Sequence, residues 1–192
     1  MENLRIVILG RQGSGKGTQC SRLGEMYGVI HISTGDMLRA AVESQTELGQ
    51  KAKAIMDAGD LVSDEIINAI VAQRIEMNDV LENGFILDGY PRTASQAQAL
   101  EEELLVKGLK LDLAINLEVP VSEVTQRMLD RSRADDTEEA IRRRLEIYEN
   151  ETTPLLEWFE DRNNLVVVSG LGPEDEVFSR LKGVIDGIIS EN

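Results

Sequence analysis

The stretch that decides the fold of this chain reads Gly10-Arg11-Gln12-Gly13-Ser14-Gly15-Lys16-Gly17-Thr18. It directly follows an apolar run over residues 4–9 and precedes a segment with helical character that extends to about residue 27. Glycines allow such a loop to curl until its backbone N–H groups converge, and the helix start adds partial positive charge. Lys16 can then reach the terminal phosphates of a nucleoside triphosphate, and Thr18 supplies a hydroxyl one position later than in the strict motif. We therefore predict a phosphate-binding loop.

Short apolar runs that read as buried strands recur along the chain, at residues 4–9, 29–32, 85–87, 111–117 and 165–168. Helical stretches of about ten or more residues separate them. This alternation predicts an α/β fold with three layers, in which a five-stranded parallel sheet is flanked by helices. We expect the whole chain, residues 1–192, to form one domain, since its length is ordinary for one.

Polar residues follow three of the predicted strands. The first strand leads into the glycine-rich loop, the second into Ser33-Thr34-Gly35-Asp36, and the third into Asp88-Gly89-Tyr90-Pro91-Arg92. Parallel sheets bind ligands outside the carboxyl ends of their strands. We therefore expect these three segments to face one crevice.

Two segments read as additions to the sheet and its helices. Residues 34–64 predict short helices with breaks at Gly49 and Gly59, and hence a small insertion that moves against the sheet. Residues 127–136 form a second, shorter excursion. The next helix is predicted to begin with Asp136 as N-cap and Glu139 at its third position, and to run to about residue 161 with a kink or break at Pro154.

The composition restricts the class of partner. A net charge of −15 argues against nucleic acid or a membrane surface, so an anion site requires local clustering of cations. Such a cluster is present at Arg127, Arg131, Arg133, Arg142, Arg143 and Arg144. Cys20 is the only cysteine, which excludes an internal disulfide and a cysteine-based zinc ribbon, and we interpret it as a core residue. No transmembrane run or signal-peptide pattern is apparent, and we expect a cytoplasmic protein.

With these segments in view, the sequence resembles the adenylate kinases, within the nucleoside monophosphate kinases, over essentially its full length. The resemblance is carried by the loop at 10–18, Ser-Thr-Gly-Asp-Met-Leu-Arg at 33–39, Leu-Asp-Gly-Tyr-Pro-Arg-Thr at 87–93, and the arginines around 127–144. It implies reversible, Mg²⁺-dependent phosphoryl transfer from ATP to AMP, giving two ADP, in adenine nucleotide homeostasis. It also implies a P-loop fold, a monomer, an AMP-binding insertion at 34–64 and a short lid at 127–136.

For the donor ATP, the resemblance implies a site built from Gly13, Ser14, Gly15, Lys16, Gly17, Thr18, Arg127 and Gly172. Arg127 would stack on the adenine, and Gly172 would approach it through its backbone. The catalytic set would be Lys16, Arg92, Arg131, Arg133 and Arg144, and Asp88 would orient Mg²⁺ through water. This agrees with the chemistry, because phosphoryl transfer needs positioning and charge neutralisation more than acid–base groups. His31, the only histidine, is interpreted as structural.

For the acceptor AMP, the resemblance implies a site built from Thr34, Gly35, Arg39, Met56, Val62, Gly89, Arg92, Gln96, Arg133 and Arg144. Arg39 and Arg92 match the arginines that bind the AMP phosphate, and Thr34 and Gln96 match positions that face the base. Gln96 has a second interpretation, because Thr93-Ala-Ser-Gln96 is also a capping box. Asp135 and Asp136 resemble the lid-hinge pair that holds the arginines. Arg142 and Arg143 are interpreted as surface ion-pair residues.

The sequence departs from the family pattern at Gln12, where proline is usual, and at Ser132, where short-lid members commonly have glycine. The lid lacks the long insertion and four metal ligands of some bacterial members, so structural zinc is not expected. The alternative acceptor is UMP or CMP, but pyrimidine kinases usually have alanine at position 34 and asparagine at position 93. A non-catalytic nucleotide-binding module is the remaining alternative. It is disfavoured because the chain has no Asn-Lys-x-Asp motif and carries a second set of phosphate-binding arginines.

Overall fold

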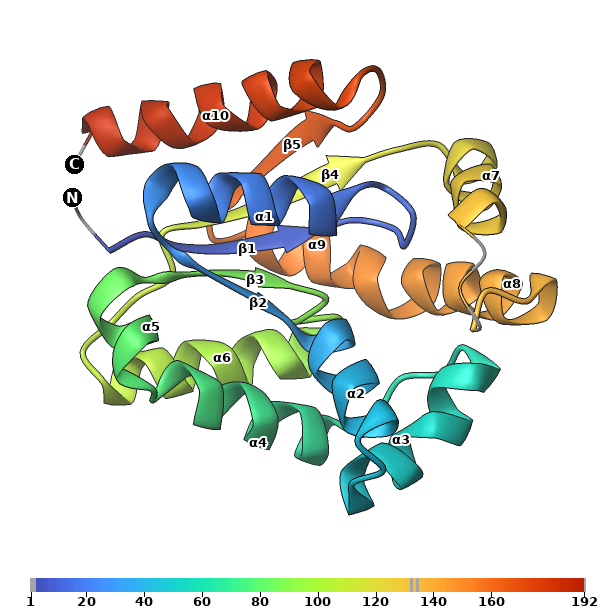
Figure 1. Cartoon of the computed structure of the whole chain (residues 1–192). Coiled ribbons are helices and arrows are strands. Elements are labelled where there is room, and N and C mark those ends of the chain that lie inside the picture. Colours follow the sequence, from blue (N-terminus) through green and yellow to red (C-terminus); the bar gives the residue numbers. More distant parts are fainter. Residues whose placement is uncertain (1–2, 132, 134, 192) are drawn as a thin grey trace.

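Five parallel strands form one sheet in the computed structural model, which describes residues 3–131, 133 and 135–191. The order is β2-β3-β1-β4-β5, and every neighbouring pair is parallel (Figure 1). The strands are β1 Arg5–Leu9, β2 Ile30–Ser33, β3 Phe85–Asp88, β4 Leu113–Glu118 and β5 Leu165–Ser169. Each coincides closely with a predicted apolar run, so the predicted α/β fold with a five-stranded parallel sheet is confirmed.

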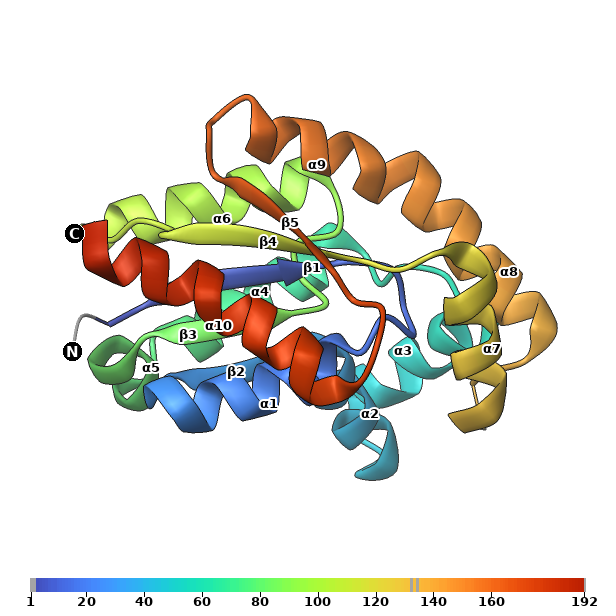
Figure 2. The same ribbon diagram turned by 90° about the horizontal axis from the view of Figure 1, so that it is seen from above.

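Both faces of the sheet are covered by helices, which is why its strands read as continuous apolar runs. Alternate β1 residues point to opposite faces: Ile6 and Ile8 belong to one buried cluster, and Val7 and Leu9 to the other. The first cluster includes side chains of α1 (Lys16–Tyr27) and α10 (Glu174–Glu191). The second is covered by α4 (Asp64–Ile75), α6 (Ala94–Val106) and α9 (Thr153–Glu160), and Figure 2 shows the layers from above. The short α5 (Asn78–Asn83) precedes β3.

The strand register aligns the polar residues that follow the strands. Ser33 of β2 pairs with Asp88 of β3, and Asp88 pairs with Ile8 of β1. The glycine-rich loop, which leaves β1 one residue after Leu9, therefore starts beside Asp88. The three polar segments meet at one edge of the sheet, as the sequence predicted.

The segment predicted to be an insertion, residues 34–64, contains α2 (Thr34–Glu43) and α3 (Glu47–Ala58). Gly59 ends α3 as its C-cap, as predicted, but the predicted break at Gly49 is wrong. Gly49 lies in the first turn of α3, and a Cβ there would come within 2.0 Å of the Ala41 carbonyl oxygen. This glycine therefore allows α3 to pack closely on α2 rather than ending a helix. The break between the two helices falls at residues 44–46.

The segment from α7 (Val121–Arg131) through α8 (Glu138–Ile147) also differs in detail from the prediction. The hydroxyl of Thr137, not the carboxylate of Asp136, caps α8 by accepting from the Ala140 N–H. After α8 comes a π-helical turn, η1 (Tyr148–Thr152), which leads into α9 near Pro154. The predicted irregularity is thus a widened turn, which accommodates a proline that cannot donate an N–H. Ser132 lies outside the described residues.

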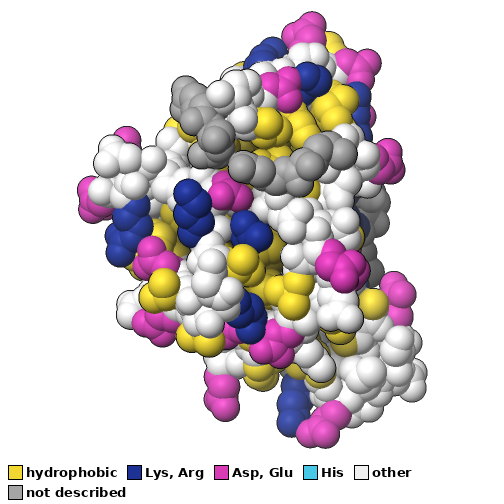
Figure 3. Space-filling model, turned by 90° about the vertical axis from the view of Figure 1, so that its left-hand side faces the viewer, with side chains coloured by type: hydrophobic (Ala, Val, Ile, Leu, Met, Phe, Trp, Pro, Cys, Tyr) yellow, Lys and Arg dark blue, Asp and Glu magenta, His cyan; other side chains and the backbone are white. Residues whose placement is uncertain are grey.

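The face that carries the two termini has interspersed acidic and basic side chains (Figure 3). The arginine-rich segments lie at the opposite end, where the strand arrows point in Figure 1. Cys20 is completely buried, which confirms its interpretation as a core residue. Within the described residues, no helix combines the length and apolarity needed to cross a membrane.

Candidate functional site

A cavity of about 320 Å³ lies beyond the carboxyl ends of β1, β2 and β3. Its walls combine the glycine-rich loop, the two polar segments after β2 and β3, and side chains of α7, α8 and η1. Cations dominate the lining, which includes Lys16, Arg39, Arg92, Arg127, Arg131, Arg133 and Arg144. In a chain of net charge −15, this is the local clustering that an anion site needs.

The glycine-rich loop has a conformation that its sequence requires. Gly13 has φ +86°, and a Cβ at this position would lie 2.7 Å from the carbonyl oxygen of Val124 in α7. Lys16 begins α1, and its Nζ donates to the carbonyl oxygens of Gly10 (2.7 Å) and Arg11 (3.0 Å). Burial lowers the pKa of this ammonium, and the neighbouring Asp88 carboxylate opposes that shift. Lys16 is therefore held over the loop whose amides form the predicted anion cradle.

A second group of contacts ties the loop to η1. Arg11 Nε donates to Glu149 at 3.1 Å, and its guanidinium lies 5.0 Å from the ring centroid of Tyr148. Gln12, at the position where proline is usual in related proteins, lines the cavity. The loop thus has an ion pair and a cation–π contact that fix its outer side.

Asp88 ends β3 on the floor of the cavity, where only 9% of its surface is exposed. Burial by itself would raise its pKa. His31, Lys16 and Arg92 outweigh this effect and hold the pKa of Asp88 below its ordinary value. Asp88 is therefore a carboxylate beside the loop lysine, which is the type of oxygen ligand that Mg²⁺ takes together with water.

The carboxylate of Asp136, one of the two aspartates predicted to form the lid hinge, holds two of the predicted catalytic arginines. Its side chain has no exposed surface and accepts from Arg131 at 2.6 Å and 3.0 Å, and from Arg144 at 2.8 Å. Asp135 accepts a further bond from Arg144 at 2.5 Å. Burial opposes ionisation of Asp136, but the two arginines prevail and lower its pKa. The arginines are therefore oriented by buried carboxylates, whereas Arg133 is exposed.

Arg127 and Arg131 both line the cavity, as expected from their i, i+4 spacing on α7. Arg127 is paired with Glu123 of the same helix, with Nε 2.8 Å from Oε1. Its NH1 lies 3.5 Å from the carbonyl oxygen of Ser14 in the loop. Arg142 and Arg143 pair instead with Glu146 and Asp60 and line neither the main cavity nor its neighbour, in agreement with their surface interpretation.

A smaller neighbouring cavity of about 60 Å³ lies between the insertion and the strand ends. It brings together nine of the ten residues predicted for the acceptor site: Thr34, Gly35, Arg39, Met56, Val62, Gly89, Arg92, Gln96 and Arg144. The tenth, Arg133, lines the main cavity but not this one. Gly35, Arg39, Gly89, Arg92 and Arg144 line both cavities. The two predicted sites therefore share a wall of cations. Arg39 is paired with Asp36, which also lines the main cavity.

Arg92 is fixed by three hydrogen bonds from different parts of the chain. Its Nε donates to the Gly89 carbonyl at 2.7 Å, and its backbone N–H donates to Gln96 Oε1 at 2.8 Å. Its carbonyl accepts from the Thr152 hydroxyl of η1 at 2.9 Å. Burial, together with Arg144 and Arg39, lowers the pKa of the guanidinium. A buried arginine with its backbone fixed on both sides is well placed to hold an anionic group in one position.

Gln96 forms one of the two hydrogen bonds of the predicted capping box, and its side chain also bonds to Arg92 and Asp64. Its backbone N–H donates to the Thr93 hydroxyl at 3.1 Å, as a capping box requires. Its side-chain oxygen accepts from the N–H of Arg92 rather than that of Thr93, and its Nε2 donates to Asp64 at 2.7 Å. An amide group has two donors and two acceptor lone pairs, so one of each remains for a ligand.

Two predicted residues stand apart from the rest. Ser14 is buried behind the loop, and Gly172, in the loop after β5, has Glu176 and Arg180 as its nearest side chains. Neither is among the residues that line the two cavities. Conversely, Tyr148, Thr152 and Leu61 line cavity walls but were not predicted. In the sequence, Tyr148 and Thr152 were marked only by lying near Pro154, and Leu61 only by lying near Gly59.

Comparisons with known proteins agree with this geometry. Residues 8–164 match the family model described as adenylate kinase. The adenylate kinase of Brucella ovis is 47% identical over 192 residues, covering 95% of this chain and 98% of that protein. The adenylate kinase of Brucella abortus strain S19 is 46% identical over the same shares of both chains. This chain belongs to the adenylate kinase family.

Proposed function

We propose that the chain catalyses reversible transfer of the terminal phosphoryl group of ATP to AMP, giving two ADP, and so contributes to adenine nucleotide homeostasis. The observation that carries the proposal is the shared wall of cations between the two cavities, with Arg92 and Arg144 lining both. A phosphoryl group in transfer has to contact the donor and acceptor sites at once. Positive groups fixed at their junction neutralise the charge that is spread over its oxygens.

On the donor side, we infer that Lys16 and the loop amides of Gly13 to Thr18 hold the β- and γ-phosphates. Lys16 would exchange its two loop carbonyls for phosphate oxygens, because an ammonium can rotate its three donors. Arg127 would stack on the adenine, and Arg131, Arg133 and Arg144 would neutralise the transferred group. The approach of Gly172 to the adenine stays a prediction.

On the acceptor side, we infer that Arg39 and Arg92 hold the AMP phosphate and that Thr34 and Gln96 face the base. Gly35, Met56, Val62 and Gly89 would complete this pocket. We infer that Asp88 would hold Mg²⁺ through water, and the donor set fits, since Asp88 is a carboxylate with a lowered pKa that lines the cavity beside the phosphate loop. When bound, Mg²⁺ would neutralise phosphate charge. Asp88, with His31 3.7 Å away, would orient the water ligands.

We further propose that the chain acts as a cytoplasmic monomer, with residues 1–192 as one domain. Both cavities are built from side chains of a single copy, which supports a monomer. The net charge of −15 supports small-molecule substrates rather than nucleic acid or a membrane surface.

The acceptor is tested by measuring ADP formed from Mg·ATP with AMP, CMP or UMP as the second substrate. We expect kcat/KM to be much higher for AMP, because Thr34 and Thr93 stand where pyrimidine kinases usually have alanine and asparagine. Higher kcat/KM with UMP or CMP would identify a pyrimidine kinase. Binding of nucleotides without turnover of any of the three would leave only a binding module.

A substitution of Gln96 tests base recognition separately. We expect Gln96→Ala to raise KM for AMP and to narrow the preference for AMP over CMP and UMP, with KM for ATP nearly unchanged. Losing hydrogen bonds to a buried base costs about 1–3 kcal/mol, or roughly 5–150-fold in kcat/KM. The matched control is Thr93→Ala, which removes only the hydroxyl that caps α6. It should lower the melting temperature and leave the AMP preference intact, and if Gln96→Ala behaves the same way, Gln96 does not read the base.

Closure of the insertion and lid around the substrates is tested by amide hydrogen exchange. We propose residues 34–64 and 127–136 as the closing elements. The insertion already contacts α8, where Arg144 donates to the Met56 carbonyl at 3.1 Å and Arg143 lies 2.7 Å from Asp60. A bisubstrate analogue should slow exchange in both segments far more than in β1 and β3, whose amides are protected in either state. Uniform slowing over the chain would contradict the model.

A further inference from the structure

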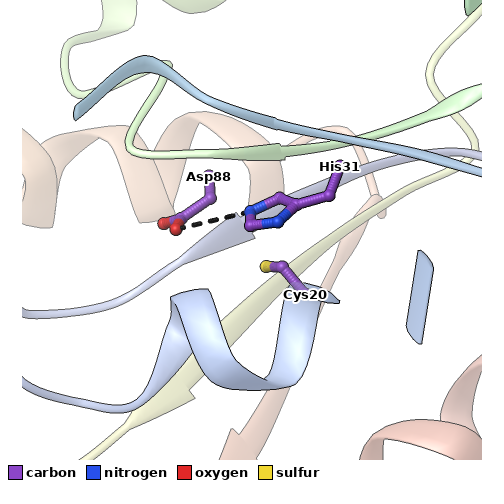
Figure 4. Close-up of side chains that lie close together, drawn as sticks. All are labelled: Cys20, His31 and Asp88. Atoms are coloured by element: carbon purple, nitrogen blue, oxygen red, sulfur yellow. Dashed lines mark ion pairs between the residues drawn. The ribbon is translucent and has the colours of Figure 1, made fainter. Parts of the chain in front are cut away.

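Three potential metal ligands meet between α1, β2 and β3, at the inner end of the phosphate loop. Cys20 lies one helical turn after Lys16, His31 lies on β2, and Asp88 ends β3. One ligand atom from each residue lies within 4.8 Å of the other two. Figure 4 shows the Cys20 thiol directed at the His31 ring, and the ring directed at the Asp88 carboxylate. Three separate elements therefore bring sulfur, nitrogen and oxygen to one point.

The histidine of this group has an unused nitrogen. His31 Nε2 is buried and has no hydrogen-bond partner among the described residues. Its distance to Asp88 Oδ2 is 3.7 Å, which is too long for a hydrogen bond. A buried polar atom without a partner costs free energy, and a bound ion is one of the ordinary ways in which such an atom is satisfied. The orphaned nitrogen thus points to a ligand between His31 and Asp88.

The chemistry of the three ligands selects the cation. Cysteine, histidine and carboxylate are the ligands of Zn²⁺, whereas Mg²⁺ takes oxygen ligands and retains most of its water. Zinc bonds of about 2.0–2.3 Å imply ligand separations near 3.5 Å, so the group would have to contract by about 1 Å. Asp88 lines the main cavity, from which water can complete the coordination.

We propose that Cys20, His31 and Asp88 form a site for one thiophilic divalent cation, with Zn²⁺ as the probe. Binding forms a sulfur–zinc bond, and the thiol proton passes to the solvent. The Cys20 side chain is buried, and it would bind the cation as a thiolate. The site is distinct from the four-ligand lid site considered from the sequence, and its existence does not depend on the proposed function.

Occupancy of this site has a consequence for the reaction, and this consequence rests on the proposed function. Asp88 cannot ligate Zn²⁺ and at the same time orient the water ligands of Mg²⁺. Zn²⁺ should therefore inhibit phosphoryl transfer, although neither Cys20 nor His31 lines the cavity. The cation site would therefore inhibit the reaction, because it shares the carboxylate of Asp88 with the proposed Mg²⁺ site.

Binding is tested on the chelator-treated chain by calorimetry with Zn²⁺ and by absorption with Co²⁺. We expect one equivalent of Zn²⁺ and, with Co²⁺, a near-ultraviolet charge-transfer band from the thiolate. Cys20→Ala should abolish the band, and both Cys20→Ala and His31→Asn should weaken Zn²⁺ binding about tenfold or more. Asp36→Asn, which alters another carboxylate of the cavity, should change neither result. Melting temperatures without metal would show that each variant is folded.

The experiments test the Zn²⁺ site and the inhibition of phosphoryl transfer separately. Absence of stoichiometric Zn²⁺ binding, absence of the thiolate band, or wild-type Zn²⁺ affinity in both folded variants would overturn the site. Inhibition is compared between wild type and Cys20→Ala in one nucleotide mixture, so that zinc bound by nucleotide is the same for both. Weaker inhibition of the variant is expected. Equal inhibition, with binding lost, would overturn the coupling through Asp88 and leave the phosphoryl transfer itself unaffected.

Discussion

Lys16→Met should reduce kcat by about a hundredfold or more while the chain stays folded, since removing a transition-state contact of this type typically has that effect. The substitution keeps an apolar stem of similar length and removes the ammonium that donates to Gly10 and Arg11. The loop glycines, including Gly13, still impose the curled backbone. The loss should therefore appear in kcat and kcat/KM rather than in the melting temperature.

The control for this prediction is Lys51→Met on α3. Lys51 is exposed, and its ion-pair partner is Glu47, four residues earlier on the same helix. Such pairs contribute little, so activity and stability should both stay near wild type. Turnover of folded Lys16→Met close to that of Lys51→Met would refute the assignment of the phosphate-binding loop.

Asp136→Asn should lower both activity and stability, because one carboxylate holds Arg131 and Arg144. Its side chain has no exposed surface, and removing its charge leaves Arg144 paired with Asp135 and Arg131 without an ion-pair partner among the described residues. Breaking a buried pair typically costs about 3–5 kcal/mol, and we expect about 2–3 kcal/mol here because Arg131 remains partly exposed. Chemical denaturation and kcat for AMP measure the two effects.

The contribution of Asp136 to the stability of the wild-type chain depends on pH, and the pKa shift gives its direction. The pKa of Asp136 lies below its ordinary value of 3.8 in the folded chain. Its stabilising contribution is therefore complete above about pH 3.8 and is lost as the pH falls through the lower folded-state pKa. Wild-type stability should approach that of Asp136→Asn in this acidic range.

The matched control is Asp60→Asn, which removes the partner of Arg143 at 2.7 Å. This is also an aspartate–arginine pair, but both side chains are about half exposed, so little change is expected. If Asp60→Asn loses as much stability as Asp136→Asn, burial does not explain the difference expected between the contributions of the two pairs.

Local sequence predicted the sheet well because its central strands, β1, β3 and β4, are buried on both faces. Residues such as Ile6 and Val7 point to opposite sides of β1, yet both sides are apolar, so the strand reads as one continuous run. The phosphate loop was equally predictable, since its glycines are required by backbone conformation and by close approach. The convergence of Ser33, Asp88 and the loop followed from parallel strands alone.

Predictions of helix boundaries failed where contacts between separate helices determined the outcome. Asp136 has a typical N-cap residue type, but Arg131 and Arg144 occupy its carboxylate, and Thr137 takes the cap. Gly49 has a helix-breaking residue type, but it serves the close packing of α3 against α2. In both cases the residue type is compatible with two structural roles, and a contact made in the folded chain determines which role it has.

The sequence by itself determined the α/β architecture, the phosphate loop and the set of candidate residues, because these depend on apolar patterning and on motifs of adjacent residues. Only the tertiary structure decided how those residues are held. The Thr152 hydroxyl of η1 fixes the carbonyl of Arg92, Gln96 divides its amide between Arg92 and Asp64, and the unpartnered nitrogen of His31 faces Asp88. Each of these contacts joins separate elements and depends on distances of about 3–4 Å, which no local pattern specifies.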